Sequence, residues 1–551
     1  MHLTNAAKHA YCFTALLLTL NVQAQEINRY ARRNWQLTDF TTDSVHGTSV
    51  SKAYAELLKG KKSHQVIVAV IDTGIDTTHE DLKGRIWTNK KEIPGNNIDD
   101  DHNGYVDDEH GWNFLGGKDG RNITQESYET EREYFRLRPL FAGVSDSMVI
   151  TEDQRKDYRY YLKLKDIHVK DSVYRTYIIK GLSSVVAKTE TVYNRWRSIL
   201  TKDTITVADI KSATAPDTAA HILRTDIINL YMQFREPLEH PIHEFLTKSK
   251  KNLAKEKSDL DSLIIDPNAM RRGVVGDDPE NINDRNYGNN NVSAGTPAHG
   301  TRVSGILAAL RHNNLGMDGV ADNVLIMSIR AIPNEDERDK DVALAIRYAV
   351  DNGARIINMS FGKSASPQKR WVDDAVKYAM LKNVLLVVCA QNWGQDIDVT
   401  EEFPSPSLGT GVYASNFITV GASAGGPDSL LAARFSNYGR KRVDLFAPGV
   451  GIYSTNPGNK YSFGNGTSYA SPIVAGIAAL VLEYYPALSA KQVKYILEKS
   501  VTKLPGVLVL KPGTNEKVPF STLSATGGIV NAYNALKLAA ATKGDGKVQS
   551  W

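Results

Sequence analysis

The feature that most constrains the fold is an alternation of short, continuous apolar runs with amphipathic segments. VIVAVI (66–71) is followed by Asp-Thr-Gly, and four later runs share its character: VLIMSI (324–329), ARIINMS (354–360), VLLVVCA (384–390) and FITVGA (417–422). Such short runs are typical of strands that are buried on both faces. DVALAIRYAVDNG (341–353) and VDDAVKYAMLKN (372–383) lie between them, with helical periodicity and helix-stop residues. Strands that alternate with helices predict an α/β fold with a central, mostly parallel sheet.

Residues 121–290 interrupt this alternation. Glycine is sparse there until Gly273, and apolar residues recur at spacings of three and four, so we expect a mainly helical insertion. The α/β domain then comprises residues 63–120 and 291–540, with an N-terminal arm over 25–62 and a C-terminal tail over 541–551. The insertion is either a surface decoration or an element that acts near the functional site, such as a lid, an exosite or an inhibitory segment, and the sequence leaves both open.

The first 24 residues (1–24) have the pattern of a secretory signal peptide. Lys8 and His9 precede the apolar segment YCFTALLLTLNV, which is too short to span a bilayer, and Val22-Gln23-Ala24 fits a cleavage site. We therefore expect a secreted, periplasmic or cell-envelope protein with no membrane span after cleavage. Cys389 would be the one cysteine left, so no internal disulfide is expected. The formal charge of +4, from 66 basic and 62 acidic residues, gives no argument for a nucleic-acid partner.

Three motifs place reactive side chains at a strand end and at two helix starts. Asp72 ends the first apolar run, in IDTGID; His299 begins AHGTRVSGILAAL, and Ser468 begins TSYASPIVAGIAALVL. Serine is a poor nucleophile alone, because it needs a base, and the base needs an acid that fixes its tautomer and stabilises its charged form. In a parallel α/β sheet, such positions gather beyond the carboxyl ends of the strands. The three motifs therefore predict nucleophilic catalysis by Ser468.

Together, VAVIDTGID, HGTRVSGILAA, INMSFG and GTSYASPIVAG resemble the Asp, His, substrate-strand and Ser blocks of the subtilisin-like serine proteases, or subtilases (peptidase S8). GGIVNAYNAL (527–536) resembles their closing segment, and the order Asp, His, Ser along the chain is that of subtilisin. The resemblance covers about 63–120 and 291–540. It implies a three-layer subtilisin-like fold and a serine endopeptidase that cleaves protein or peptide substrates through an acyl-enzyme, with no cofactor for catalysis.

The resemblance also assigns roles to individual residues. Asp72 would orient the base, His299 would act as general base and acid, and Ser468 would be the nucleophile. CAQNWG matches the turn that carries the oxyanion-hole asparagine of the family, which makes Asn392 the candidate donor.

The same likeness identifies a candidate substrate strand. Ser360, Phe361 and Gly362 match the segment that pairs with an extended substrate as an added strand. Gln391 stands where the family usually has a small residue, so the preference for the substrate residue at P1, which supplies the scissile carbonyl, stays open. The physiological substrate, maturation by cleavage and the oligomeric state also stay open.

Two other functions are compatible with parts of the sequence. Asp-Thr-Gly also occurs in aspartic proteases, in which two carboxylates share a proton, but the chain has no second comparable motif. That reading would also leave the His and Ser motifs unexplained. The other alternative is a catalytically silent binding scaffold that retains the fold, and the intact Asp, His, Ser and Asn motifs argue against it.

The acidic segment NNIDDDHNGYVDDEHGWNF (96–114) carries oxygen ligands at alternate positions, as in the first half of an EF-hand calcium loop. The candidate ligands are the side chains of Asp99, Asp101, Asn103 and Asp107 and the backbone carbonyl of Tyr105. His110 falls where an EF-hand has a bidentate glutamate, so the loop is not an EF-hand, and Asp107 or Asp108 would complete the shell. The alternative is an acidic, solvated turn. We expect a structural calcium ion here, in keeping with the resemblance, because subtilases often bind calcium in surface loops.

Overall fold

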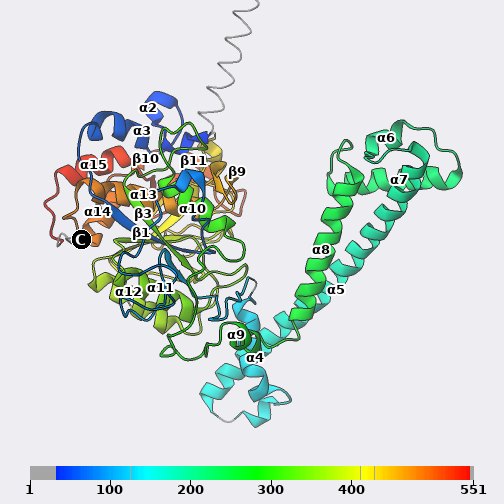
Figure 1. Ribbon diagram of the computed structural model, residues 1–551, viewed down its shortest axis with the longest axis horizontal. Helices are drawn as coiled ribbons and strands as arrows, with labels where there is room; N and C mark the ends of the chain where they lie inside the picture. Colours follow the sequence, from blue (N-terminus) through cyan, green and yellow to red (C-terminus); the bar gives the residue numbers. More distant parts are fainter. Residues whose placement is uncertain (1–32, 125, 150, 410, 427, 547–551) are drawn as a thin grey trace, which may run out of the picture. The chain divides into compact units, whose positions relative to one another are not determined.

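The computed structural model describes residues 33–124, 126–149, 151–409, 411–426 and 428–546. The chain forms two compact units, drawn in Figure 1. One comprises the described residues of Met1–Glu129 and Arg271–Trp551, and the other comprises those of Thr130–Met270. The predicted signal peptide, the first residues of the predicted arm (25–32) and the end of the predicted tail (547–551) lie outside the described residues.

In the described part of the chain, the first unit is built around a nine-stranded sheet with the order β10-β13-β7-β6-β5-β4-β1-β3-β2. All neighbouring strands are parallel except β10 and β13. The strands are β1 (Val66–Asp72), β2 (Gly111–Asn113), β3 (Val324–Arg330), β4 (Ile356–Met359), β5 (Leu385–Cys389), β6 (Phe417–Ser423), β7 (Leu445–Pro448), β10 (Thr502–Lys503) and β13 (Gly528–Ile529). The predicted α/β fold with a mostly parallel sheet is confirmed, and all five apolar runs form strands of this sheet.

Helices cover both faces of the sheet, which explains why its strands are apolar on consecutive residues. Along β1, Val68 and Val70 pack into one hydrophobic cluster, whereas Ala69 and Ile71 pack into another. The first cluster includes residues of α10 (Ala298–Ala308), α13 (Thr467–Tyr484), α14 (Ala490–Lys499) and α15 (Ala532–Ala540), and the second includes residues of α11 (Asp339–Asp351) and α12 (Lys369–Leu381). In Figure 1, α11 and α12 lie on the opposite side of the sheet from α14 and α15.

Helix α13 is the central helix of the first cluster. Among the described residues, it is the one helix long and apolar enough to cross a membrane, and 94% of its apolar window is buried inside the protein. Its apolar character is therefore that of a core helix. The segment before β1 packs on the same cluster through Leu37, Val50 and Ala53.

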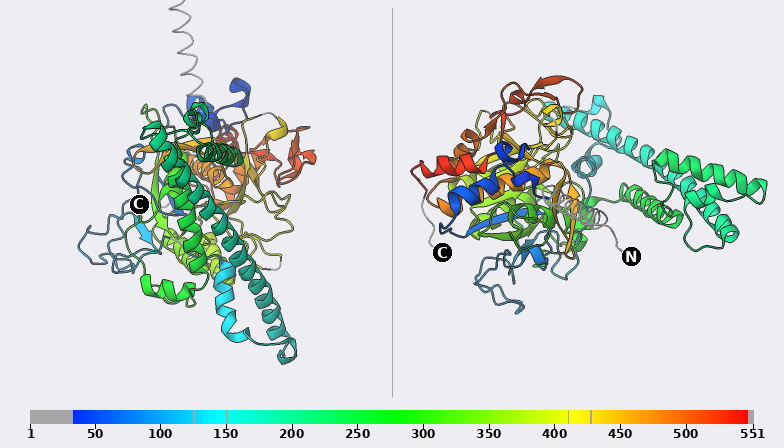
Figure 2. Two further views of the ribbon diagram at one scale, coloured as in Figure 1. Left: turned by 90° about the vertical axis from the view of Figure 1, so that its right-hand side faces the viewer. Right: turned by 90° about the horizontal axis from the view of Figure 1, so that it is seen from above.

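The second unit is formed by helices. α5 (Glu152–Leu200), which has 49 residues, packs along α8 (Ile242–Ser262), and the two run side by side in Figures 1 and 2. Tyr231 and Trp196, both buried, belong to the hydrophobic cluster that also includes residues of α6 (Val207–Ser212), α7 (Thr218–Phe234) and α8. The range predicted to be a helical insertion, 121–290, contains this unit, together with short segments that belong to the first unit.

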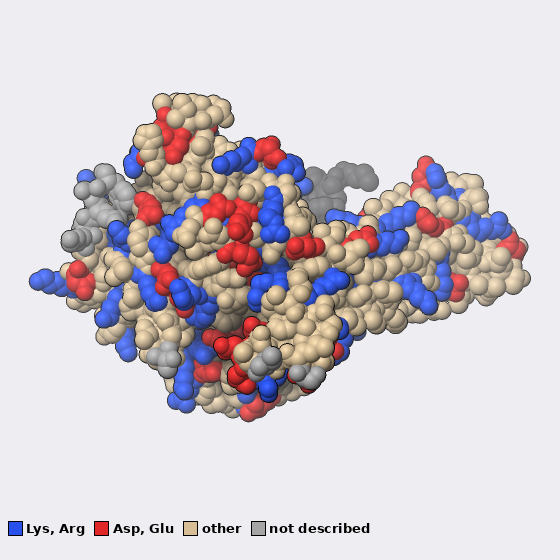
Figure 3. Space-filling view, turned by 90° about the horizontal axis from the view of Figure 1, so that it is seen from below, with Lys and Arg blue, Asp and Glu red and all other residues tan. Residues whose placement is uncertain are grey.

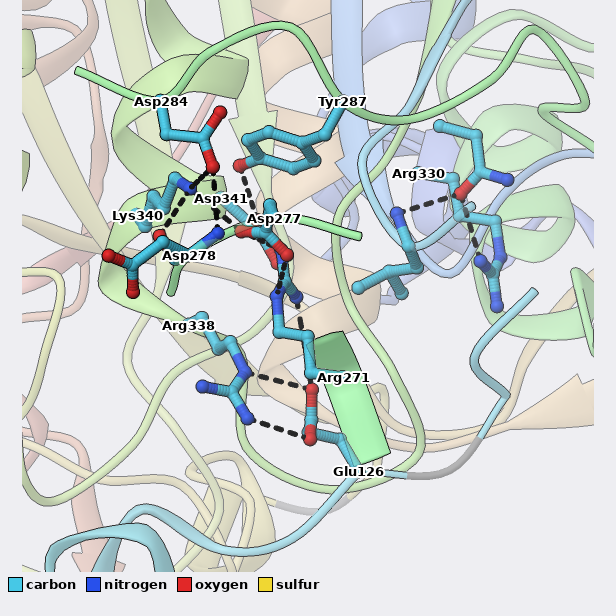
Figure 4. Close-up of polar contacts among 12 residues, drawn as sticks. Glu126, Arg271, Asp277, Asp278, Asp284, Tyr287, Arg330, Arg338, Lys340 and Asp341 are labelled. Carbon is cyan, nitrogen blue, oxygen red and sulfur yellow. Dashed lines mark hydrogen bonds and ion pairs between the residues drawn. The ribbon is translucent and has the colours of Figure 1, made fainter. Parts of the chain in front are cut away.

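The first unit contains a buried ionic cluster that includes Glu126 and Arg271, which lie near the ends of its two segments in the chain. Figure 4 shows the polar contacts of this cluster. Arg271 donates hydrogen bonds of 2.7 Å to Asp277 and Asp341, and its Nη1 lies 3.9 Å from Glu126. Arg338 pairs with the same Glu126 carboxylate at 2.9 and 3.0 Å. The side chains of Arg271, Asp277 and Asp341 have no exposed surface. The cluster therefore joins both flanking segments to α11, which carries Asp341, through charges that solvent cannot screen.

Candidate active site

The fold positions Asp72, His299 and Ser468 at the ends of elements that pack together. Asp72 is the last residue of β1, and His299 and Ser468 are the second residues of α10 and α13. α10 contacts both β1 and α13. The close approach of α10 to the turn after β1 requires a glycine at position 300, because a β-carbon there would lie 2.2 Å from the Gly74 carbonyl oxygen.

Asp72 and His299 form a hydrogen-bonded pair. Nδ1 of His299 lies 2.8 Å from Oδ1 of Asp72, which also accepts a 2.8 Å bond from the Thr73 N–H. Because an ionised carboxylate only accepts, the proton of neutral His299 is on Nδ1, and Nε2 is left as the basic atom. Burial lowers the pKa of His299, but the charge and the hydrogen bond of Asp72 outweigh it, so the pKa lies above its ordinary value of 6.5. The arrangement can therefore accept a proton at Nε2.

The start of α13, which carries Ser468, lies beside this pair. The Tyr469 ring meets the His299 ring edge-on, with 6.4 Å between the ring centroids. Ser468 is buried, and its carbonyl oxygen accepts a 3.0 Å hydrogen bond from Ser360 Oγ. Ser360 Oγ also lies 2.8 Å from Ser471 Oγ. Ser360, which directly follows β4, is therefore hydrogen-bonded to the first turn of α13.

Asn392 is held beside the same helix start. Its Oδ1 accepts hydrogen bonds from the backbone N–H of Thr467, at 2.9 Å, and from the Thr467 hydroxyl, at 3.0 Å. These bonds engage the oxygen of the amide, so Nδ2 is the group that remains to donate. Asn392 itself is exposed, as a residue that meets a substrate must be.

The candidate substrate strand follows β4 directly. The Cys389 thiol lies 3.6 Å from the carbonyl oxygen of Phe361, and burial raises the pKa of this thiol to about 12, so it stays protonated. Lys363 and Phe403 exchange two backbone hydrogen bonds of 2.9 Å. Ser360–Gly362 therefore lie between the helix start at Ser468 and the segment around Phe403.

The acidic loop brings together a set of carboxylates that the sequence pattern identified only in part. Oxygens of Glu92, Asp99 and Asp101 all lie within 4.8 Å of one another. Asp99 accepts bonds from the N–H groups of Asn103 and Gly104, which shapes the turn around them. Three converging carboxylates suit a hard cation such as Ca²⁺.

Glu92 is the functional candidate that sequence reasoning missed. It lies seven positions before Asp99, outside any alternating ligand pattern, and only the folded loop brings it to Asp99 and Asp101.

The Asp107 carboxylate accepts hydrogen bonds from the N–H groups of Asn96 and Asn97, at 3.2 and 2.9 Å.

Two other residues of the loop are held by protein contacts. The Asp108 carboxylate accepts bonds of 2.5 Å from the Tyr348 hydroxyl and 3.1 Å from the Asn103 amide. The Tyr105 ring packs edge-on against Trp112, at 5.0 Å between the ring centroids. Asn103, Tyr105 and Asp107 remain predicted ligands of the loop.

Comparisons with known proteins identify the class to which this fold and site belong. Residues 63–517 match the sequence profile described as Subtilase family, peptidase S8. Alkaline elastase YaB of Bacillus sp. (strain YaB) is 36% identical over 218 residues, which are 39% of this chain and 53% of that protein. Thermophilic serine proteinase of Bacillus sp. (strain AK1) is 37% identical over 239 residues, which are 43% of this chain and 52% of that protein. The alignments thus span about half the length of these two relatives.

A further relative and a solved structure complete the comparison. Subtilisin DY of Bacillus licheniformis is 37% identical over 207 residues, which are 37% of this chain and 71% of that protein. Among solved structures, a protease from Pseudoalteromonas arctica PAMC 21717 has a TM-score of 0.36 and 27% identity, over 44% of this chain and 70% of that one. The chain belongs to the subtilase family of serine proteases.

Proposed function

We propose that this protein is a serine endopeptidase that hydrolyses peptide bonds through an acyl-enzyme on Ser468. The observation that carries the proposal is the 2.8 Å pair of His299 and Asp72 beside the helix start that bears Ser468. Membership in the subtilase family supports the same reaction.

In the first step, Nε2 of His299 takes the Ser468 hydroxyl proton while Oγ attacks the substrate carbonyl carbon. Asp72 keeps the imidazole in the required tautomer and stabilises its charged form. The developing oxyanion would accept hydrogen bonds from Asn392 Nδ2 and the Ser468 N–H, and one such side-chain donor stabilises the transition state by about 3–4 kcal/mol. Protonated His299 then gives its proton to the leaving amine. In the second step His299 activates a water, which hydrolyses the acyl-enzyme and regenerates the Ser468 hydroxyl.

The substrates would be extended peptides or unfolded protein segments. Ser360–Gly362 would pair with the substrate backbone as a neighbouring strand, a mode in which main-chain hydrogen bonds supply affinity. Lys and Arg side chains are interspersed with Asp and Glu on the face drawn in Figure 3, in keeping with the small net charge of +4. This distribution favours no nucleic-acid partner.

The acidic loop would hold a structural Ca²⁺ ion. Glu92, Asp99 and Asp101 would supply carboxylate oxygens, with the predicted contributions of Asn103, of Asp107 and of the Tyr105 carbonyl. The ion would neutralise three converging charges and fix the segment between β1 and β2. It has no part in the chemical steps.

The proposed location is outside the cytoplasm, as a secreted or periplasmic protein. The support is the signal-like pattern of residues 1–24, which lie outside the described residues. Expression of the full chain with N-terminal sequencing of the mature form tests this, and cleavage after Ala24 is the expected result.

Labelling with a serine-reactive fluorophosphonate tests the enzymatic function. The wild-type chain should be labelled at Ser468, as located by mass spectrometry of its peptides, and Ser468→Ala should not be labelled. If the folded wild type is not labelled, or Ser468→Ala is labelled equally, the chain is a silent scaffold with this fold.

A further inference from the structure

A small pocket lies beside the proposed reaction centre. Its lining includes Cys389, Ala390 and Gln391, which directly precede Asn392, together with Glu402 and Phe403. Phe403 pairs with Lys363, the residue after the candidate substrate strand. The pocket therefore lies between the oxyanion candidate and the strand that would hold the substrate backbone. A peptide with its scissile carbonyl at Asn392 and its backbone along residues 360–362 would direct its P1 side chain here.

The side chain of Gln391 contacts both neighbours of this pocket wall, and Gln391 is one of the residues that line the pocket. Its Nε2 donates a 3.3 Å hydrogen bond to Cys389 Sγ. The same nitrogen lies against Gly362: a β-carbon at position 362 would be 2.2 Å from it. Gln391 thus spans the gap between the end of β5 and the substrate strand. The free volume left in the pocket is about 20 Å³, room for roughly one water molecule.

The backbone of Gln391 is also unusual. Its φ is 75°, in the left-handed region that favours glycine, yet a long side chain occupies the position. The carbonyl of Gln391 accepts a 2.9 Å hydrogen bond from the Asn437 N–H, and this bond helps to hold the turn. The turn therefore fixes the position of the Gln391 backbone, and the hydrogen bond to Cys389 Sγ fixes the position of the side-chain amide.

We propose that Gln391 determines P1 specificity by filling the pocket, so that the enzyme cleaves after small residues such as glycine, alanine and serine. The proposal rests on the proposed endopeptidase function and names its substrate class. The large side chains of leucine and phenylalanine need far more than the space of one water molecule. They enter only if the Gln391 side chain gives up its contacts with Cys389 and Gly362.

The test compares peptides that differ only at P1, with alanine, leucine or phenylalanine, by their kcat/KM values. The kcat/KM of wild type should be at least about tenfold higher for the alanine peptide than for the phenylalanine peptide. A steric clash the size of one or two methylene groups lowers kcat/KM by about that factor. Gln391→Ala should raise the ratio of phenylalanine to alanine at least tenfold. Gln391→Met, which restores the length without the amide, should return the ratio towards that of wild type. Gln391→Gly, which adopts φ 75° without strain, serves as a second enlarging variant.

Gln395→Ala is the matched control, because Gln395 is exposed in the same loop and does not line the pocket. Its ratio of kcat/KM for phenylalanine to that for alanine should equal that of wild type.

Titration of each variant with a fluorophosphonate gives the concentration of reactive Ser468, so a misfolded variant is not mistaken for a selective one. A labelled wild type that prefers phenylalanine or leucine would overturn the proposal, as would a ratio in Gln391→Ala and Gln391→Gly within threefold of wild type. An unlabelled wild type would instead contradict the endopeptidase function.

Discussion

His299 Nδ1 lies 2.8 Å from Asp72 Oδ1, although 227 residues separate the two along the chain. The helical unit Thr130–Met270 lies within that interval, and the sheet and α10 nonetheless bring the pair together. This hydrogen bond is the strongest structural argument that His299 is oriented as the general base of a serine protease.

Replacing Asp72 tests what that bond does to the base. Catalysis needs neutral His299, so kcat/KM should rise with pH as the proton leaves, and Asp72 holds the wild-type pKa above 6.5. Asp72→Asn removes the charge, so the midpoint of the pH profile should move to lower pH while kcat falls by about 10⁴-fold. Asp76→Asn, which changes a half-buried turn carboxylate bonded to the N–H groups of Thr78 and Gly458, is the control and should keep the wild-type midpoint. Equal midpoints in Asp72→Asn and wild type would contradict the assignment.

The oxyanion role of Asn392 predicts a loss in kcat with little change in KM. Asn392→Ala removes the Nδ2 donor, which acts only as negative charge develops, so kcat should fall by about 10²–10³-fold. Thr467→Val removes one of the two bonds that orient the amide and leaves the donor, so its loss should be under about tenfold. Single-turnover kinetics separates the chemical step from binding. An Asn392→Ala enzyme with the wild-type kcat would remove Asn392 from the oxyanion site.

The calcium assignment predicts that a chelator lowers thermal stability. Without the ion, the carboxylates of Glu92, Asp99 and Asp101 repel one another, so Tm should fall when calcium is removed. The double variant Asp99→Asn/Asp101→Asn should have a Tm that no longer responds to chelator. Glu109→Gln, which changes a half-buried carboxylate that pairs with His110 and lies outside the three-carboxylate set, should respond like wild type. A wild-type Tm unaffected by chelator would show that the loop is only an acidic turn.

The buried cluster around Arg271 predicts a large stability effect at a site without catalytic function. Arg271→Met leaves the Asp277 and Asp341 carboxylates in the interior without their main partner, and removing one member of a buried pair costs about 3–5 kcal/mol. Arg121→Met breaks the exposed pair with Asp119 and an exposed hydrogen bond to the Gly273 carbonyl, and its effect should be small, under about 1 kcal/mol. Urea unfolding measures both. Equal midpoints for the two variants would mean that the cluster does not stabilise the first unit.

Much of the fold followed from the sequence because its strands are buried on both faces. β1 and β5 are continuous apolar runs with no competing helical period, and packing on both sides of the sheet explains that pattern. Asp72 could be predicted as a site residue because it ends such a run, and His299 because it begins a helical motif, which is α10. The short strands β10 and β13 have no comparable signal, since two residues are too few to show a period.

Other features depend on tertiary packing that no local pattern encodes. Glu92 joins Asp99 and Asp101 only through the path of the loop between them. Gln391 was recognised as an unusual residue, but the contact of its amide with Gly362 depends on how β5 and the segment after β4 approach each other. The sequence therefore located the pocket wall and left its effect on P1 undefined.

The most direct test of the central claim is the kcat/KM of the full chain and of Ser468→Ala on one quenched peptide with alanine at P1. Circular dichroism should first show that both proteins have the same helix content and Tm. Nucleophilic catalysis by Ser468 predicts that wild type cleaves the peptide and that Ser468→Ala loses activity by a factor on the order of 10⁶. A folded Ser468→Ala that keeps a tenth or more of the wild-type rate would contradict the account.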